Sequence, residues 1–177
     1  KLRASFGQTG NNGIGNNQYQ SLFGYGGAYD NNGAVAPSTF GNLIISWETA
    51  ELLDVGVDFS LFDGRLSGGV TYYEKTTEDL LQSVPLSRTT GHTSQTMNIG
   101  SILNKGVEVE IDAQVLRTKD FSFEIYGNFS ENNDEVLRLA QDAAGNDINL
   151  DSGYYTTRVG LPRAQWYIRT WGGVDPA

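Results

Sequence analysis

Apolar and polar residues alternate one by one along three long runs of this chain. The clearest run covers 53–61, where the odd positions are apolar and the even positions are polar or glycine. The runs at 107–115 and 121–130 repeat the pattern, and shorter versions lie at 2–6 and 66–72. A period of two is typical of a strand with one apolar face, whereas a helix needs apolar residues three and four apart. The pattern therefore predicts about six strands and no helix of comparable length.

The connections between these strands alternate between short and long. The short ones are 62–65, which contains the hairpin signal Asp-Gly, and the polar turn 117–120. The long ones cover roughly 8–46, 76–105 and 131–163. Since every second connection is short, all the long ones should emerge on one side of the sheet. Short turns on one side and long loops on the other are typical of outer-membrane barrels, whose short turns face the periplasm. We therefore expect an all-β antiparallel meander that forms part of a large transmembrane β-barrel.

Composition and charge narrow the possibilities. The 177 residues have a mean hydropathy of -0.36. No stretch approaches the roughly 20 apolar residues of a membrane helix. The 21 acidic and 12 basic residues give a formal charge of -9, which argues against a nucleic-acid partner because such proteins carry basic patches. The absence of cysteine excludes disulfides and thiolate metal sites.

Both ends of the sequence are typical of a fragment. Lys1 begins directly on a strand pattern, and Val174-Asp175-Pro176 resembles the entry to a turn. An open sheet of about six strands in lipid would leave two unpaired edges, and each unsatisfied backbone group costs several kcal/mol. We therefore expect residues 1–177 to be part of a β-barrel domain whose other strands lie elsewhere in a parent chain.

Three segments carry a resemblance to a known family: 1–16, 46–81 and 98–110. Their most specific motifs are Trp47-Glu48-Thr49, Asp79-Leu80-Leu81, Asn98-Ile99-Gly100-Ser101 and Asn104-Lys105-Gly106. In order and spacing they resemble the C-terminal barrel region of SusC/RagA-type TonB-linked outer-membrane proteins, the large nutrient importers of Bacteroidota. The segment 160–176 is similar to the family's Gly-x-Pro…Gly-Val-Asp-Pro stretch, although its core at 166–171 departs from the usual sequence.

The resemblance implies a barrel of about 22 strands in the cell outer membrane, filled by an N-terminal plug. It also implies energy supplied through the TonB complex, and a SusD-like lipoprotein that captures glycans or peptides. Outer-membrane lipid would surround the barrel. The plug and the TonB box are not found in these 177 residues, so we expect TonB to act through another region of the parent chain. Neither a cofactor nor a bound metal is expected.

Five carboxylates lie on the polar sides of the predicted strands. Successive side chains on one strand face are about 6.5 to 7 Å apart, a separation at which paired glycosidase carboxylates can work. The same positions would line the polar lumen of a large barrel. No nucleophile partner or second catalytic motif accompanies them, so we favour lumen lining and expect no enzyme and no catalytic residues. These lumen-facing candidates are Asp54, Asp58, Glu108, Glu110 and Asp112.

The predicted loops contain further candidates. Four aromatic residues lie among glycines and amides and suit contacts with a sugar or peptide, although packing of the loop is the favoured role: Tyr19, Phe23, Tyr25 and Tyr29. The single histidine, His92, has too few partner ligands for zinc and is expected in a solvated loop. The stretch 142–151 is rich in Asp and Asn and could bind calcium, but we favour a flexible polar loop.

One alternative fold stays open from the residues alone. A soluble β-sandwich, such as a carbohydrate-binding module, would bury the apolar strand faces between two sheets instead of exposing them to lipid. Such a fold would have to order or shorten the long loops, and it gives no reason for their alternation with short turns.

Overall fold

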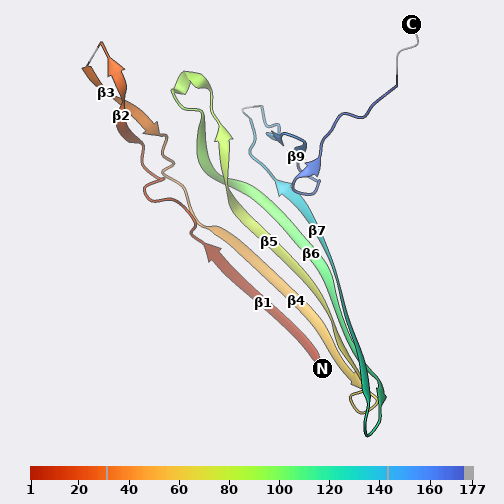
Figure 1. Cartoon of the computed structure of the whole chain (residues 1–177). Helices are drawn as coiled ribbons and strands as arrows, with labels where there is room; N and C mark the ends of the chain where they lie inside the picture. Colours follow the sequence, from red (N-terminus) through yellow and green to blue (C-terminus); the bar gives the residue numbers. More distant parts are fainter. Residues whose placement is uncertain (31, 143, 174–177) are drawn as a thin grey trace.

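Five long strands form one antiparallel sheet in the order β1-β4-β5-β6-β7 (Figure 1). The computed structural model describes residues 1–30, 32–142 and 144–173, with the side chains of all of these except Tyr29. The long strands are β1 (Leu2–Asn11), β4 (Glu48–Leu61), β5 (Leu66–Pro85), β6 (Ser94–Arg117) and β7 (Ser122–Arg138). The expected antiparallel meander is therefore confirmed.

Shorter elements lie in the connections at one end of this sheet. A hairpin of β2 and β3 interrupts the passage from β1 to β4, and β8, β9 and β10 form a small sheet after β7. Their bounds are β2 (Leu22–Tyr29), β3 (Asn32–Thr39), β8 (Leu150–Ser152), β9 (Tyr155–Thr157) and β10 (Gln165–Trp166), and a single 3-10 turn, η1, covers Arg88–Thr90. In the described ranges we find no helix with the length and apolar character needed to cross a membrane.

The tight turns and the long connections lie at opposite ends of the strands, as expected. The turns after β4 and β6 lie together at the lower end, and the other connections lie at the upper end (Figure 1). The first turn is strongly constrained, because Phe62, Asp63 and Gly64 all have positive φ, at 56°, 55° and 83°. Glycine and aspartate tolerate this region far better than β-branched residues do.

The predicted loop at 76–105 is wrong in extent. β5 continues to Pro85 and β6 starts at Ser94, so only Leu86–Thr93 connects them. Likewise, β7 continues to Arg138, well into the predicted loop at 131–163. These upper halves mix polar stretches, such as Lys75 to Glu78, with scattered apolar residues, so the one-by-one apolar alternation that marks a half-buried strand is absent. Backbone pairing with the neighbouring strand keeps them extended.

The register places apolar side chains in rows across one face of the sheet. In one row Leu2 pairs with Val57, then Val70, Val109 and Phe129 follow across the strands. The row above it contains Ala4, Val55, Tyr72 and Val107 and ends on β7 with Glu131. A row below it contains Leu61, Leu66, Ala113 and Ile125. Most of these side chains are exposed, and no second sheet covers them within the described residues. The sheet therefore presents a broad apolar band on one side of a single layer.

The apolar band has a sharp upper limit. The next row on the same face contains Phe6 and Leu53 but then Glu74, Lys105 and Asn133. Tyr72 lies at this limit, and its hydroxyl donates a hydrogen bond to Glu74 Oε2 at 3.0 Å. Charged side chains thus replace apolar ones on the same face, although the strands continue upward.

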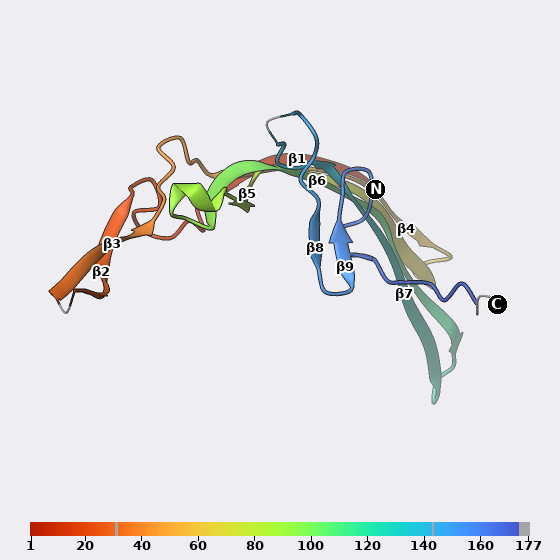
Figure 2. The same cartoon turned by 90° about the horizontal axis from the view of Figure 1, so that it is seen from above.

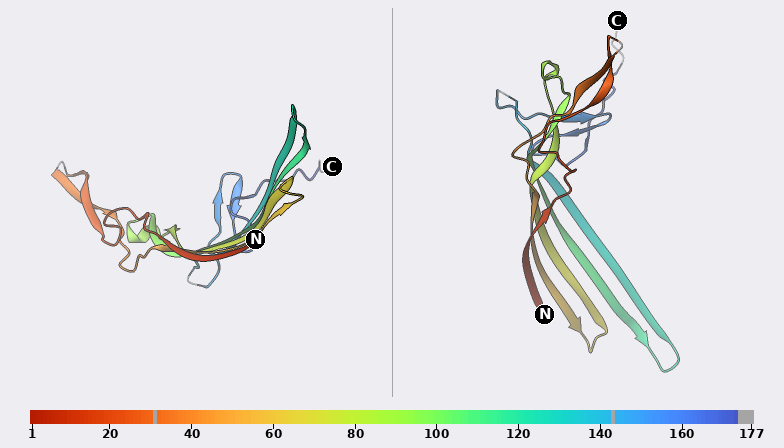
Figure 3. Two further views of the ribbon diagram at one scale, coloured as in Figure 1. Left: turned by 90° about the horizontal axis from the view of Figure 1, so that it is seen from below. Right: turned by 90° about the vertical axis from the view of Figure 1, so that its left-hand side faces the viewer.

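The opposite face is polar, and it is the concave side of the curved sheet. On this face one row contains Arg3, Thr71, Glu108 and Ser130. The chain after β7 bends back over the same face, where the Arg163 backbone N–H donates to Asp134 Oδ2 at 2.6 Å. Figures 2 and 3 show β8 and β9 inside the arc of the sheet. The small apolar core lies beneath this segment and consists mainly of Val136, Leu139 and Ala140.

A glycine on the polar face makes room for an aromatic ring. Tyr73 lies opposite Gly106, and its hydroxyl donates to Asn132 Oδ1 at 2.8 Å, one strand further on. A Cβ placed on Gly106 would overlap the backbone oxygen of Glu131 and lie 2.6 Å from the Tyr73 hydroxyl. The glycine therefore lets one side chain connect three strands.

We predict that Gly106→Ala lowers the unfolding free energy of the parent barrel by about 1 to 3 kcal/mol, because the backbone of β6 or β7 must shift. Gly127→Ala is the matched control, since a Cβ there would meet nothing within 4 Å. The urea midpoint of heat-modifiable gel migration measures both variants. Equal midpoints would show that the Tyr73 contact places no limit on residue 106.

Candidate functional site: the polar face and the loops above it

Four of the five predicted lumen residues meet around a hollow on the polar face. Asp54, Asp58, Glu108 and Glu110 line a space of about 430 Å³ together with Arg3, Thr71 and two glycines. The fifth, Asp112, lies lower and lines a neighbouring hollow with Glu110, Tyr126 and Asn128. The strand period of two thus gathers these carboxylates on one face, as the sequence predicted.

One arginine offsets part of this negative charge. Arg3 Nε lies 3.3 Å from Asp58 Oδ1, and Arg3 Nη2 donates to Thr71 Oγ1 at 2.6 Å. Both partners of the ion pair are about half-exposed, so the pair contributes little to stability. Its main effect is on the shape and charge of the face, because the guanidinium also covers Gly56.

The aromatic loop candidates do not converge on one pocket. Phe23 and Tyr25 lie on β2 opposite Pro37 and Val35, and their side chains are 67% and 96% exposed. Tyr19 lies apart from them in the turn before β2. The backbone of Tyr29 pairs with Asn32 at the tip of the hairpin, while its side chain falls outside the described part of the structure. Two of the four therefore form an exposed aromatic face.

The base of the hairpin contacts the loop between β5 and β6. Phe40 and His92 lie with ring centroids 5.1 Å apart, and Gln95 Nε2 donates to Gly41 O at 2.6 Å. Asn42 is buried and donates to Thr96 O at 3.0 Å. His92 lies in a loop as predicted, but it packs against Phe40 and is only partly exposed. The two long connections therefore support each other.

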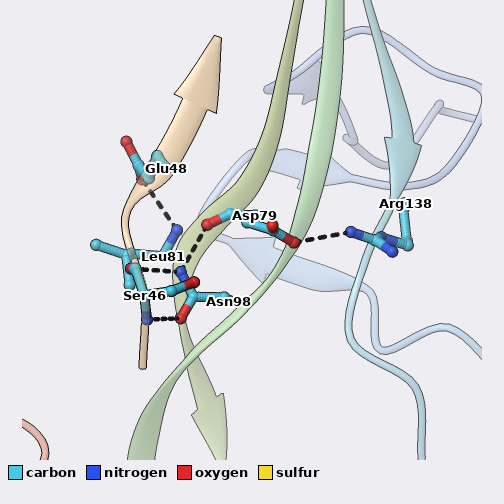
Figure 4. A network of polar contacts seen from close by, with 6 residues as sticks. All are labelled: Ser46, Glu48, Asp79, Leu81, Asn98 and Arg138. Carbon is cyan, nitrogen blue, oxygen red and sulfur yellow. Dashed lines mark hydrogen bonds and ion pairs between the residues drawn. The ribbon is translucent and has the colours of Figure 1, made fainter. Parts of the chain in front are cut away.

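A polar cluster ties four strands together at the upper end of the sheet (Figure 4). The Asn98 side chain from β6 donates to Ser46 O at 2.8 Å and accepts from Ser46 N–H at 2.8 Å. It also donates to Asp79 O at 2.9 Å. The side-chain amide thus makes the pair of hydrogen bonds that a neighbouring strand would make with Ser46.

A bulge in β5 makes this contact possible. Asp79 has a positive φ of 54°, and the pairing of β5 with β6 shifts between Thr77 and Leu81. Asp79 Oδ1 pairs with Arg138 Nη2 of β7 at 3.3 Å, and Glu48 Oε1 accepts from Leu81 N–H at 2.9 Å. The sequence pattern predicts no role for these residues. The available signal was that three of the quoted family-like motifs contain Glu48, Asp79 and Asn98.

The oxygen-rich stretch at 142–151 uses its oxygens internally. Asp142 Oδ1 accepts hydrogen bonds from the backbone of Asn146 at 2.9 Å and of Ala144 at 2.8 Å. These bonds, that from Asn146 foremost, lower the pKa of the Asp142 carboxyl below its ordinary value. Asp151 Oδ1 accepts from Thr156 at 2.5 Å and lies 3.8 Å from Arg158. Across the described residues no group of three potential metal ligands comes together.

The chain resembles a family of known proteins over almost its whole length. Residues 1–175 match the family model described as "TonB dependent receptor-like, beta-barrel". The chain is 42% identical over 142 residues to TonB-dependent receptor P39 of Formosa agariphila. This alignment covers 80% of this chain and 14% of the relative. It is 35% identical over 167 residues to TonB-dependent receptor SusC of Bacteroides thetaiotaomicron, covering 88% and 16%.

Solved structures show the same arrangement of strands. The structure of the RagAB peptide transporter matches 98% of this chain with a TM-score of 0.84 and 30% sequence identity. The match covers 19% of that chain. This chain therefore spans less than a fifth of the relatives that it resembles.

We predict that Asn98→Ala releases the segment around Ser46, because Ser46 loses both hydrogen bonds to the side-chain amide. Removal of one partner from such a contact costs about 1 to 3 kcal/mol. Hydrogen exchange of 44–48 in the intact parent protein should accelerate. Asn128→Ala is the control, since Asn128 is an exposed asparagine on β7 of the same sheet. Unchanged exchange in the Asn98 variant would contradict the assigned role.

Proposed function

Because the chain belongs to the TonB-dependent receptor-like β-barrel family, we propose that it forms a section of the wall of a SusC/RagA-like importer. Receptors of this family are outer-membrane proteins, so the five-stranded sheet is part of an outer-membrane barrel. The relatives are named as receptors and transporters rather than enzymes. We propose the same for this chain, with residues 1–177 as a part of the barrel domain.

The apolar band is the observation that carries the proposal. On β6 it extends from Val107 to Leu116, which at about 3.3 Å per residue and a tilt of about 40° gives a height of roughly 23 Å. The apolar band of an outer-membrane barrel is about 25 Å tall. Lipid is the solvent that stabilises such an exposed face. The upper halves of β5 and β6 would then rise above the outer leaflet and hold the long loops there.

We further propose that the concave polar face lines the lumen. The segment around Arg163 lies over this face, on the side opposite the apolar band. Asp54, Asp58, Glu108, Glu110 and Asp112 would then contact water or a passing ligand. They would act as a charged lining and not as catalytic residues, which agrees with relatives that are named as receptors and transporters.

The loops at the upper end are the proposed contact region for ligand and partner. Phe23 and Tyr25 offer exposed rings, which suit stacking against a sugar or the side chains of a peptide. A SusD-like lipoprotein would approach from this side, and TonB would engage a region of the parent chain outside these residues. The RagAB structure is that of a peptide transporter, and the names of the related receptors specify no ligand, so we propose a glycan or a peptide as the ligand.

The β-sandwich alternative receives no support from the comparisons. A sandwich requires a second sheet packed against the apolar face. Among the described strands, the only other sheets consist of two or three short strands at the upper end of the large sheet. A carbohydrate-binding module is therefore not proposed.

The two faces of β6 give a direct test of the membrane orientation. Val109→Arg should destabilise the full-length barrel by roughly 2 to 4 kcal/mol, because a charge would face the middle of the bilayer. Glu110→Arg should assemble normally and alter only ligand selectivity. Outer-membrane yield and heat-modifiable migration measure both. Normal assembly of Val109→Arg together with misfolding of Glu110→Arg would reverse the assignment of the faces.

Loop and turn changes should have opposite effects. Excision of 23–38 with a two-glycine link should leave assembly intact and reduce ligand uptake, because Leu22 and Thr39 are paired and easily joined. Replacement of Asp63 and Gly64 by valine should impair assembly, since both have positive φ. Replacement of Lys119 and Asp120, in the turn after β6, by valine is the matched control, since neither residue has a positive φ. Unchanged uptake after excision would argue that the hairpin makes no functional contact.

A further inference from the structure

A second cavity lies between the upper sheet and the segment after β7. Its volume is about 440 Å³, and its apolar lining includes Leu80 of β5, Ile102 of β6, Leu139 and Leu150. Two arginines complete it: Arg138 at the end of β7 and Arg163 in the returning segment. The cavity thus combines an apolar surface with two guanidinium groups, on the concave side of the sheet.

The lining of the cavity contains two arginines and one carboxylate, Glu48, in a chain of formal charge -9. Arg138 has one ionic partner, Asp79, and both side chains are about half-exposed. The guanidinium of Arg163 has no ion pair or hydrogen bond within the described residues. The backbone of Arg163 is nevertheless fixed, because its N–H donates to Asp134 at 2.6 Å.

Glu48, the only carboxylate in that lining, makes no ion pair with either arginine among the described residues. Glu48 Oε1 accepts from Leu81 N–H at 2.9 Å, and Glu48 Oε2 accepts from Asn11 Nδ2 at 2.8 Å. Both oxygens are therefore held by the wall of the sheet. A guanidinium with a fixed backbone and five N–H donors remains available for a ligand.

We propose that this cavity binds a carboxylate group of the transported ligand, with Arg163 as the main contact and Arg138 beside it. The leucines and Ile102 would cover an apolar sugar face or side chain next to that carboxylate. Arginine forms paired, charge-assisted hydrogen bonds with carboxylates, which makes it well suited to this selection. The inference rests on the proposed importer function and narrows the ligand to an acidic oligomer, either an oligosaccharide of uronic acids or a peptide.

The test uses the full-length parent protein in detergent and two matched pairs of probes. One pair is trigalacturonate and its neutral methyl ester, and the other is a tetrapeptide with a free carboxyl end and its C-terminal amide. Titration calorimetry should give at least tenfold tighter binding of the acid form in one pair, which also identifies the source of the carboxylate. Equal affinities within both pairs, or no binding of any probe, would overturn the proposal.

Two variants assign the effect to the cavity. Arg163→Gln should weaken binding of the acid form about tenfold or more and leave the neutral form unchanged, as expected for loss of a charge-assisted contact. Arg117→Gln, at the lower end of β6, is the control for charge alone. An equal loss for acid and neutral forms, or a lower unfolding midpoint with unchanged affinities, would give Arg163 a structural role instead. Outer-membrane assembly, measured in the same strains, tests the importer proposal separately.

Discussion

The hydrogen-bond ladder of the five long strands is the constraint on which the rest of the structure depends. In lipid every backbone group must find a partner within the protein, and an antiparallel sheet provides one for each residue of an inner strand. The ladder also fixes the register, and with a side-chain period of two a slip by one residue would exchange the two faces. The apolar rows around Val57 and Val109 and the polar row around Glu108 are therefore results of one pairing. The outer edges of β1 and β7 need strands from the rest of the barrel in the same way.

Above the apolar band the ladder is modified, and side chains take over part of its task. Asp79 adopts a left-handed conformation, β5 bulges, and Asn98 supplies the hydrogen bonds that Ser46 would otherwise lack. Bulges commonly redirect a strand at the rim of a barrel. Here the redirected strand is held by side-chain contacts to β4, β6 and β7. The long connection before β4 thereby has a fixed origin, and the loops above it need not be rigid throughout.

The concave side carries its charged side chains in two groups. The middle of the sheet has Asp54, Asp58, Glu108 and Glu110 against a single arginine, Arg3. The upper cavity presents Arg138 and Arg163 together with Glu48, and Asp79 pairs with Arg138. Electrostatic interactions between such partly exposed groups are modest and fall with salt, so the charges shape this side of the sheet more than they stabilise it.

The sequence by itself determined the strand faces, the two tight turns and the side on which the long loops lie, because alternation and turn residues are local properties. It also placed Asp54 with Asp58 on one strand face and Glu108 with Glu110 on another, because of the period of two, while the register of β4, β5 and β6 brings both pairs to the same face of the sheet. The upper halves of β5 and β6 were decided by tertiary pairing, because their apolar residues do not alternate one by one with polar residues and so give no local strand signal. The Asn98 contact, the packing of His92 against Phe40 and the meeting of Arg138 with Arg163 likewise depend on segments far apart in the chain. Only the folded sheet brings those segments to the same place.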